Sequence, residues 1–153
     1  MVENQNESNS KLDYKTTDRG SAEHTNINSE TESLSPETIK CKKILELDQS
    51  IRYAGICSAN GTLMASEYKK SITPLLNGTE LEFSAINSVV KSIERELLVG
   101  RKLGKINYSV SSYDNVKRAT FPLGDGRCLL VSFELNAIDN LIVNKVLKEM
   151  NLR

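Results

Sequence analysis

The stretch that decides the fold reads KINYSVSSYDNVKRATFPLGDGRCLLVSFEL, residues 105–135. Two turn signals, Asp114-Asn115 and Gly124-Asp125-Gly126, divide it into three runs of strand-forming residues. The first run alternates apolar and polar side chains, which is typical of a half-buried strand. The last run is almost continuously apolar, which indicates a strand that is buried on both faces. We therefore predict three successive strands over residues 106–111, 116–123 and 128–134.

A second pair of strands is predicted upstream of this stretch. Residues 51–58 carry apolar side chains on both faces, which suits a central strand, and Ile51, Tyr53 and Cys57 are expected to share one of these faces. Asn60-Gly61 then favours a tight hairpin, because both residues tolerate positive φ. Residues 62–68 are expected to form the returning strand.

Helix signals flank the predicted strands. Ser35 and Pro36 are typical of a helix start, so the first helix is predicted over residues 36–47. The second helix is predicted to begin at a capping box formed by Thr79 and Glu82 and to end at Gly100 or Gly104. Its inner face is expected to consist of apolar residues at three- and four-residue spacing. These residues are Ile86, Val89, Val90, Ile93 and Leu97.

A last helix is predicted after the third strand of the opening stretch. Asn136 is its expected N-cap, and Asp139 stands at the third helical position. Its expected inner stripe contains Leu141, Ile142, Val146, Leu147 and Met150.

The order of the elements is helix, two strands, helix, three strands, helix. Too few helices follow strands for a parallel sheet, so we predict an α+β fold with a five-stranded antiparallel sheet. Residues 35–153 are expected to form this single domain. Residues 1–34 are rich in Asn, Ser, Thr and Glu and are predicted to be a disordered acidic tail.

Charge distribution, cysteine content and the lack of long apolar segments indicate the cellular location that we expect for the protein. The chain holds 20 basic and 20 acidic residues, but residues 1–37 contain three basic and eight acidic side chains, so the remainder is mildly basic. Three widely spaced cysteines suggest buried, reduced thiols. We find neither an apolar secretory segment at the amino terminus nor an apolar run long enough to span a bilayer. We therefore expect a cytoplasmic protein without membrane contact.

Catalytic and metal-binding arrangements find little support. The only histidine, His24, lies in the predicted tail, so a Ser-His-Asp or Cys-His arrangement is not expected. Cys41, Cys57 and Cys128 lack the paired spacing of a zinc site and are interpreted as packing residues. We predict a protein that is not an enzyme and that has no cofactor.

The order of elements, together with the residue 51–68 hairpin and its Asn60-Gly61 turn, resembles the roadblock group of dynein-light-chain-like proteins, which relate to profilin-like and PAS-like sheets. The resemblance implies a non-enzymatic module that dimerises by joining sheets or packing helices and often binds small GTPases. It assigns no functional residues. The runs YSVS (108–111), NVKR (115–118) and TFPL (120–123) also resemble an uncharacterised family of small proteins from ammonia-oxidising archaea.

Six residues form the candidate surface for a ligand or a partner. They are Tyr53, Arg101, Lys102, Tyr108, Tyr113 and Arg118. The tyrosines could line a small-molecule pocket in which Arg118 pairs an anionic ligand, or they could simply pack against neighbouring strands. The basic residues could contact nucleic acid, although a solvated face explains them better.

Three functions are carried forward. The leading hypothesis is a non-catalytic cytosolic interaction module, expected to be a homo-oligomer. The alternatives are a PAS-like or profilin-like sensor of a small molecule and a weak nucleic-acid-binding protein, of which the last is the least favoured.

Overall fold

The computed structural model describes residues 33–152, and within them the predicted α+β architecture is confirmed. The elements in chain order are α1 (Pro36–Glu46), β1 (Ile51–Cys57), β2 (Leu63–Tyr68), α2 (Gly78–Leu103), β3 (Ser109–Ser112), β4 (Lys117–Pro122), β5 (Cys128–Phe133) and α3 (Asp139–Glu149). All neighbouring strands are antiparallel, in the order β2-β1-β5-β4-β3. The predicted tail lies, as far as residue 32, outside the described residues.

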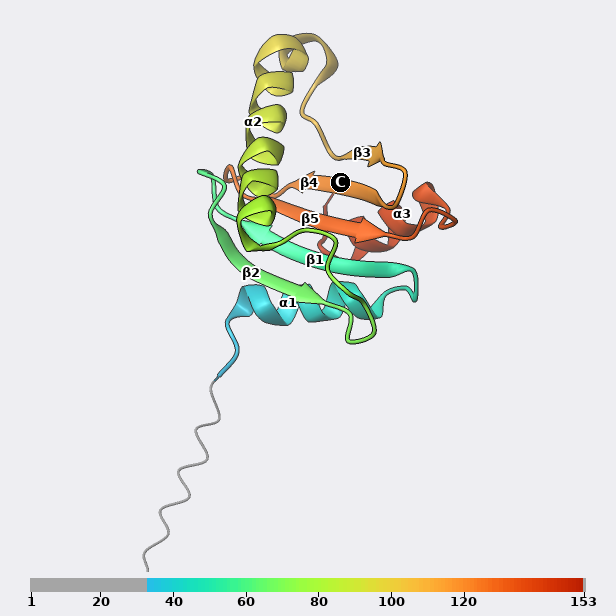
Figure 1. Cartoon of the computed structure of the whole chain (residues 1–153). Helices are drawn as coiled ribbons and strands as arrows, with labels where there is room; N and C mark the ends of the chain where they lie inside the picture. Colours follow the sequence, from blue (N-terminus) through green and yellow to red (C-terminus); the bar gives the residue numbers. More distant parts are fainter. Residues whose placement is uncertain (1–32, 153) are drawn as a thin grey trace, which may run out of the picture. The chain divides into compact units, whose positions relative to one another are not determined.

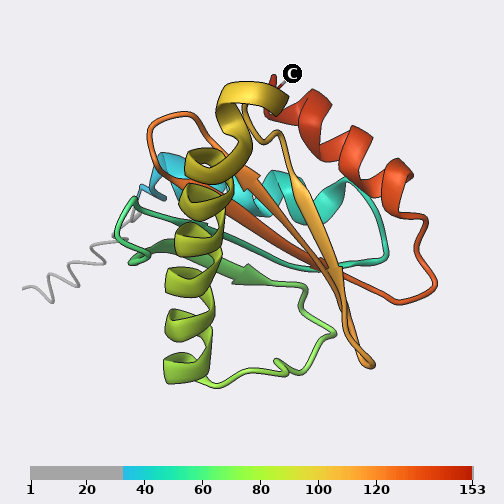
Figure 2. The same cartoon turned by 90° about the horizontal axis from the view of Figure 1, so that it is seen from above.

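The helices divide unequally between the two faces of the sheet. Figures 1 and 2 show α1 and α3 on one face and α2 alone on the other. The α1–α3 face holds the larger core, in which Phe121, Phe133 and Leu129 are fully buried against Ile44 and Ile142. Burial of such large apolar side chains is the main favourable term in folding. This face therefore contributes most of the stability of the fold.

The α2 face is packed more thinly. α2 buries Leu81, Ala85, Val89 and Ser92, which recur at three- and four-residue spacing. Opposite them the sheet presents Tyr53, Cys57, Cys128 and Leu130. Since Ala85 and Ser92 are small, they let the backbone of α2 come close to the strands.

The predicted inner face of this helix is therefore wrong except at Val89. Ile86, Val90, Ile93 and Leu97 are all exposed. The spacing identifies an apolar face, but Leu81 and Ala85 turn a neighbouring face of the helix toward the sheet.

The start of α2 also differs from the prediction. The N-cap is Asn77, whose side-chain oxygen accepts from the Glu80 amide at 3.0 Å, while the Glu80 carboxylate accepts from the Asn77 amide at 2.8 Å. This is a capping box with the predicted geometry, but it lies two residues before Thr79 and Glu82. At the other end, Gly104 is the C-cap with φ +85°, as expected for one of the two predicted glycines.

The predicted N-cap of α3 also differs from the observed one. Ile138 is the N-cap, and no side chain caps the helix, so the predicted role of Asn136 is wrong. Asp139 instead accepts a hydrogen bond from the Lys117 ammonium at 2.7 Å, which ties the first turn of α3 to β4. The buried stripe of α3 contains Val143 rather than Leu141, which is exposed.

Local irregularities change the faces of single residues. A shift in register between Ile51 and Tyr53 places Ile51 in the α1–α3 core instead of beside Tyr53. The β1–β2 hairpin is confirmed, but only Gly61 of the Asn60-Gly61 pair adopts positive φ. The first strand of the opening stretch is shorter than predicted and begins at Ser109.

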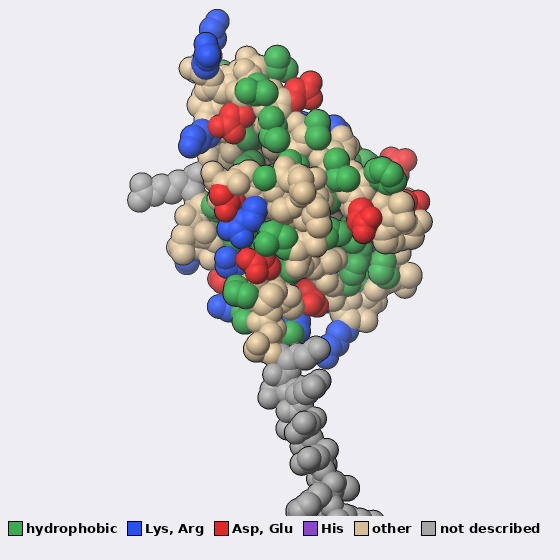
Figure 3. Space-filling view, turned by 90° about the vertical axis from the view of Figure 1, so that its left-hand side faces the viewer, with side chains coloured by type: hydrophobic (Ala, Val, Ile, Leu, Met, Phe, Trp, Pro, Cys, Tyr) green, Lys and Arg blue, Asp and Glu red, His purple; other side chains and the backbone are tan. Residues whose placement is uncertain are grey.

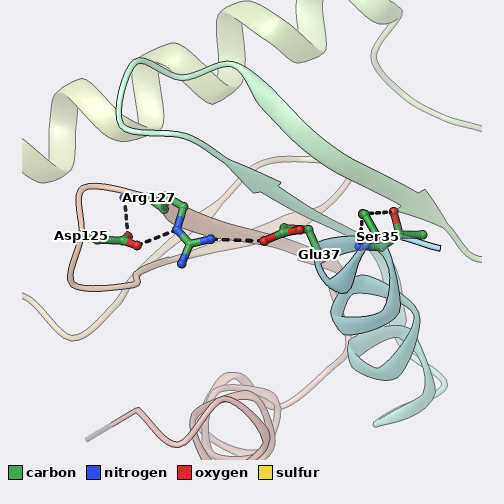
Figure 4. A network of polar contacts seen from close by, with 5 residues as sticks. Ser35, Glu37, Asp125 and Arg127 are labelled. Carbon is green, nitrogen blue, oxygen red and sulfur yellow. Dashed lines mark hydrogen bonds and ion pairs between the residues drawn. The ribbon is translucent and has the colours of Figure 1, made fainter. Parts of the chain in front are cut away.

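Polar contacts fasten the edges of the α1–α3 layer. Ser35 caps α1 as predicted, with its hydroxyl accepting from the Thr38 amide at 3.1 Å. Arg127, at the end of the β4–β5 turn, donates to the Asp125 carboxylate at 2.7 Å and to the Glu37 carboxylate at 3.3 Å (Figure 4). The second contact joins the first turn of α1 to a turn that lies far from it in sequence.

A second tether joins α3 to the loop after α1. The Lys145 ammonium donates to the Asp48 carboxylate at 2.6 Å. This bond, together with bonds from Ser50, lowers the pKa of Asp48 to about 2.

Replacing Val131 by aspartate should destabilise the fold by several kcal/mol, on the order of 3–5. Val131 is 1% exposed in β5 and pairs with Ala54 and Ala119, so the carboxylate would be buried without a partner. Urea denaturation measures the free energy of unfolding. Ser112→Asp, at an exposed position of β3, is the matched control and should leave stability nearly unchanged. Equal midpoints for the two variants would contradict the two-sided burial of β5.

Replacing Asn77 by alanine should lower the free energy of unfolding by about 1 kcal/mol, because the Glu80 amide loses its acceptor. Thr79→Ala should have a much smaller effect, since Thr79 lies inside the helix and does not cap it. Thermal melting of the two variants compares the two candidate caps directly. If Thr79→Ala lowered the stability more than Asn77→Ala, Thr79 would be the cap, as predicted from the sequence.

Candidate functional site

An apolar stripe runs along the outer side of α2. It consists of Ile86, Val90, Ile93 and Leu97, all exposed, and these residues are hereafter the α2 stripe. Leu97 is the most exposed of the four, at 77%. Figure 3 shows hydrophobic side chains reaching the surface on this side of the molecule. A contiguous apolar stripe of this kind is typical of a protein contact surface.

Charges of opposite sign flank the two ends of α2. Glu80 and Glu82 lie in its first turns, and Arg101 and Lys102 lie in its last turn. The acidic residues complement the positive end of the helix dipole, and the basic residues complement its negative end. All four side chains are exposed, so they are available to a partner.

The other flank of α2 forms a polar depression against β3 and β4, hereafter the α2–β4 groove. Its helix side consists of Ser84, Asn87, Ser88, Lys91 and Arg95. Its sheet side consists of Ser109, Ser111, Tyr113, Arg118 and Thr120. This half of the sheet is left bare because α2 packs over β1 and β5.

Arg118 lies where three concave regions of the α2 face meet. Its guanidinium donates to the Ser84 hydroxyl, which links β4 to α2. Burial raises the pKa of Tyr53 to about 12, whereas the nearby Arg118 charge acts in the opposite direction on both Tyr53 and Tyr68. Arg118 therefore also acts on the two tyrosines that line the neighbouring depression.

The structure brings together only part of the predicted candidate surface. Tyr113 and Arg118 share the α2–β4 groove. Tyr53 is 3% exposed and packs against the Tyr68 ring at 4.7 Å between centroids, so it belongs to the core. Tyr108 packs 6.2 Å from Phe121, whose side chain lies on the opposite, α1–α3 face.

Arg101 and Lys102 do not line the groove. The predicted surface did not include Asn87, Lys91 and Arg95, which follow one another at four-residue spacing and therefore share one side of the helix. That spacing was the only signal available in the sequence.

The three cysteines are buried, as predicted. Burial raises the pKa of Cys41 to about 11. The pKa of Cys128 is also raised, mainly by its contact with Cys57 and secondly by burial. Cys57 donates from its sulfur to the Cys128 carbonyl at 3.5 Å across the β1–β5 ladder. The same contact with Cys128 lowers the pKa of Cys57. All three side chains are buried and act as packing groups.

Two further observations concern residues 33–152 alone. In this part of the chain no three His, Cys, Asp or Glu side chains gather into a possible metal-binding group. None of its helices combines the length and the apolar character that a bilayer crossing requires.

The fold is that of roadblock/LC7 proteins. A roadblock/LC7 domain from Streptomyces avermitilis is 13% identical, with a TM-score of 0.60 over 74% of this chain and 91% of that chain. The gliding protein MglB from Thermus thermophilus is 12% identical, with a TM-score of 0.62 over 77% and 88%. MglB from Myxococcus xanthus is 12% identical, with a TM-score of 0.61 over 78% and 93%.

The roadblock resemblance predicted from the sequence is thus confirmed at the level of the fold. The chain belongs to a family of unknown function, DUF6659, whose model matches residues 31–151. No curated protein matches the chain. The resemblance to small archaeal proteins stays a prediction.

Gly61 is predicted to be required for the close packing of α2 against the β1–β2 turn. Gly61 has φ +84°, and a Cβ there would lie 2.5 Å from the Cα of Ile86. Gly124 has a similar φ of +91°, but a Cβ there would meet no atom within 4 Å. Both alanine variants share the backbone strain, so Gly61→Ala should be the less stable by about 1–3 kcal/mol from the clash. Equal thermal stability of the two variants would show that α2 is not held at this turn.

Proposed function

We propose that this chain is a non-catalytic interaction module that works as a homodimer joined through the α2 stripe. The observation that carries the proposal is the row of four large apolar side chains that α2 leaves exposed over three turns. Covering such a row removes apolar area from water and is favourable. The fold supports the proposal, since structures with it include one described as MglB with a tetrameric arrangement.

A second copy of the chain fits the stripe better than an unrelated partner. A two-fold symmetric pair uses the same surface twice, and when the two-fold axis is perpendicular to α2 the two helices run antiparallel. Glu80 and Glu82 at the start of one helix would then oppose Arg101 and Lys102 at the end of the other. Opposite charges at both ends favour this register and oppose a parallel pair. Arg101 and Lys102 thereby gain a role at the rim of the interface.

The remaining parts of the proposal follow the composition of the chain. Residues 35–153 act as the single folded unit in the cytoplasm, and the acidic segment 1–34 serves as an accessory arm. The roadblock resemblance makes a small GTPase a candidate for a further protein partner. The three cysteines are buried, so none of these thiols is presented to a substrate at the surface.

Sedimentation velocity at micromolar concentration should give about twice the chain mass of 17.0 kDa for the unmodified protein. Val90→Asp places a charge in the centre of the stripe and should shift the population to the monomer with unchanged melting of secondary structure. Asn87→Asp adds the same charge on the same helix, outside the stripe, and should leave the dimer intact. A monomeric wild-type chain at tens of micromolar would overturn the proposal.

Charge reversal tests the antiparallel register. Glu82→Lys and Arg101→Glu should each weaken the dimer, because each places like charges opposite one another at both ends of the pair. The double variant restores opposite charges and should recover most of the lost affinity. A double variant that dimerises more weakly than either single variant would contradict this register while leaving the stripe itself in place.

A further inference from the structure

The charges in the α2–β4 groove are all of one sign. Lys91 and Arg95 from α2 and Arg118 from β4 line it, together with serine, threonine and tyrosine hydroxyls and the Asn87 amide. No carboxylate lines this groove. Three cations around one depression repel one another, and the cost falls when an anion binds among them.

Arg118 differs from most of the partly buried cations of the described chain, which pair with a carboxylate. Arg52 pairs with Glu134 at 2.6 Å, Lys117 with Asp139 at 2.7 Å, and Lys145 with Asp48 at 2.6 Å. Within residues 33–152 Arg118 has no carboxylate partner. In this part of the chain its guanidinium makes one hydrogen bond, to the Ser84 hydroxyl.

A guanidinium carries five N–H donors, so Arg118 retains donors after it has bonded to Ser84. Most comparable cations have a carboxylate partner, and Lys69 bonds to the main-chain carbonyls of Asp48 and Gln49. Arg118 bonds to a single neutral hydroxyl and so keeps donors for a ligand.

We propose that the α2–β4 groove binds the phosphate of a small organic phosphomonoester. A phosphomonoester carries a charge of about −1.5 to −2 at neutral pH and three acceptor oxygens, which matches three cations and several hydroxyl donors. A carboxylate has a single charge and two oxygens, and it would balance only one of the three cations. The site is independent of the α2 stripe, which lies on the opposite flank of the same helix.

The neighbouring trough indicates what the phosphate is attached to. This trough shares Ser84, Asn87, Tyr113 and Arg118 with the groove. Beyond them it is lined by apolar side chains, namely Leu75, Leu76, Phe83 and Val116. A ligand with its phosphate in the groove can therefore lay an apolar or aromatic body along Tyr113 and Phe83.

Two carboxylates near the groove favour a small ligand with one phosphate over a polyanion such as a nucleic-acid strand. Glu80 and Asp114 also line the trough but do not line the basic groove. A nucleic-acid strand would bring further phosphates toward these carboxylates and would be repelled. A single phosphate with an uncharged body avoids this repulsion, so we assign the site to a small molecule.

Titration of the full-length chain with phenyl phosphate, followed by NMR chemical shifts and calorimetry, tests the assignment. Phenyl phosphate should bind more tightly than inorganic phosphate, and phenol should not saturate the groove. Arg118→Gln and Lys91→Gln should each raise the Kd for phenyl phosphate about tenfold, the effect of removing one charged hydrogen bond. Lys102→Gln is the matched control, because Lys102 lies on the same helix outside the groove, and it should leave the Kd unchanged.

Further measurements separate a loss of phosphate binding from unfolding and from loss of the dimer. Melting curves of Arg118→Gln verify that a lost affinity does not come from unfolding, and Lys91→Gln, an exposed position, provides the second variant. The Val90→Asp variant should bind phenyl phosphate as the wild type does, whatever its oligomeric state, so failure of the dimer and failure of this site can be told apart.

Three results would overturn the assignment. They are an absence of saturable phenyl phosphate binding, an equal effect of Lys102→Gln and Arg118→Gln, and tight binding of a single-stranded oligonucleotide that phenyl phosphate does not displace and that falls steeply with salt.

Discussion

The pairing of β1 with β5 is the constraint on which the rest of the structure depends. These strands lie far apart in the chain, as the 71-residue separation of Cys57 and Cys128 shows, and both are buried on both faces. β2 attaches to the outer edge of β1, and β4 followed by β3 attaches to β5. α1 packs on β1 and α2 packs on β5, so closing one long-range ladder supports both core layers. Closure of so long a loop is costly in chain entropy, and two-sided burial of these strands offsets that cost.

The unequal covering of the two faces explains both candidate surfaces. α1 and α3 together cover one face, whereas α2 alone must cover five strands on the other (Figure 2). α2 uses small residues such as Ala85 to sit close to β1 and β5, which leaves the β3–β4 half of that face bare. The bare half becomes a basic groove, and the outer side of α2 keeps an apolar stripe. Partner binding and ligand binding would thus share one helix but use opposite flanks of it.

Local sequence signals were reliable where a single segment decides the outcome and ambiguous where two segments compete. Ser35 caps α1 as expected because nothing nearby offers an alternative. The start of α2 contains two overlapping capping boxes at identical spacing, Asn77 with Glu80 and Thr79 with Glu82, and the fold uses the earlier one. At α3 the expected cap Asn136 is not used, and the first turn is instead bonded to β4 through Asp139 and Lys117.

The sequence by itself determined the order of the elements, the five antiparallel strands, the two-sided burial of β5 and the burial of the cysteines. These follow from periodicity and turn chemistry within short windows. Only the tertiary structure decided which side of α2 faces the sheet, because an amphipathic pattern does not specify the rotation of a helix that has apolar residues on two sides. The same rotation brings Lys91 and Arg95 beside Arg118 from a different element. The candidate groove depends on that packing, and for this reason the sequence alone yielded two of its residues, Tyr113 and Arg118, but not the site.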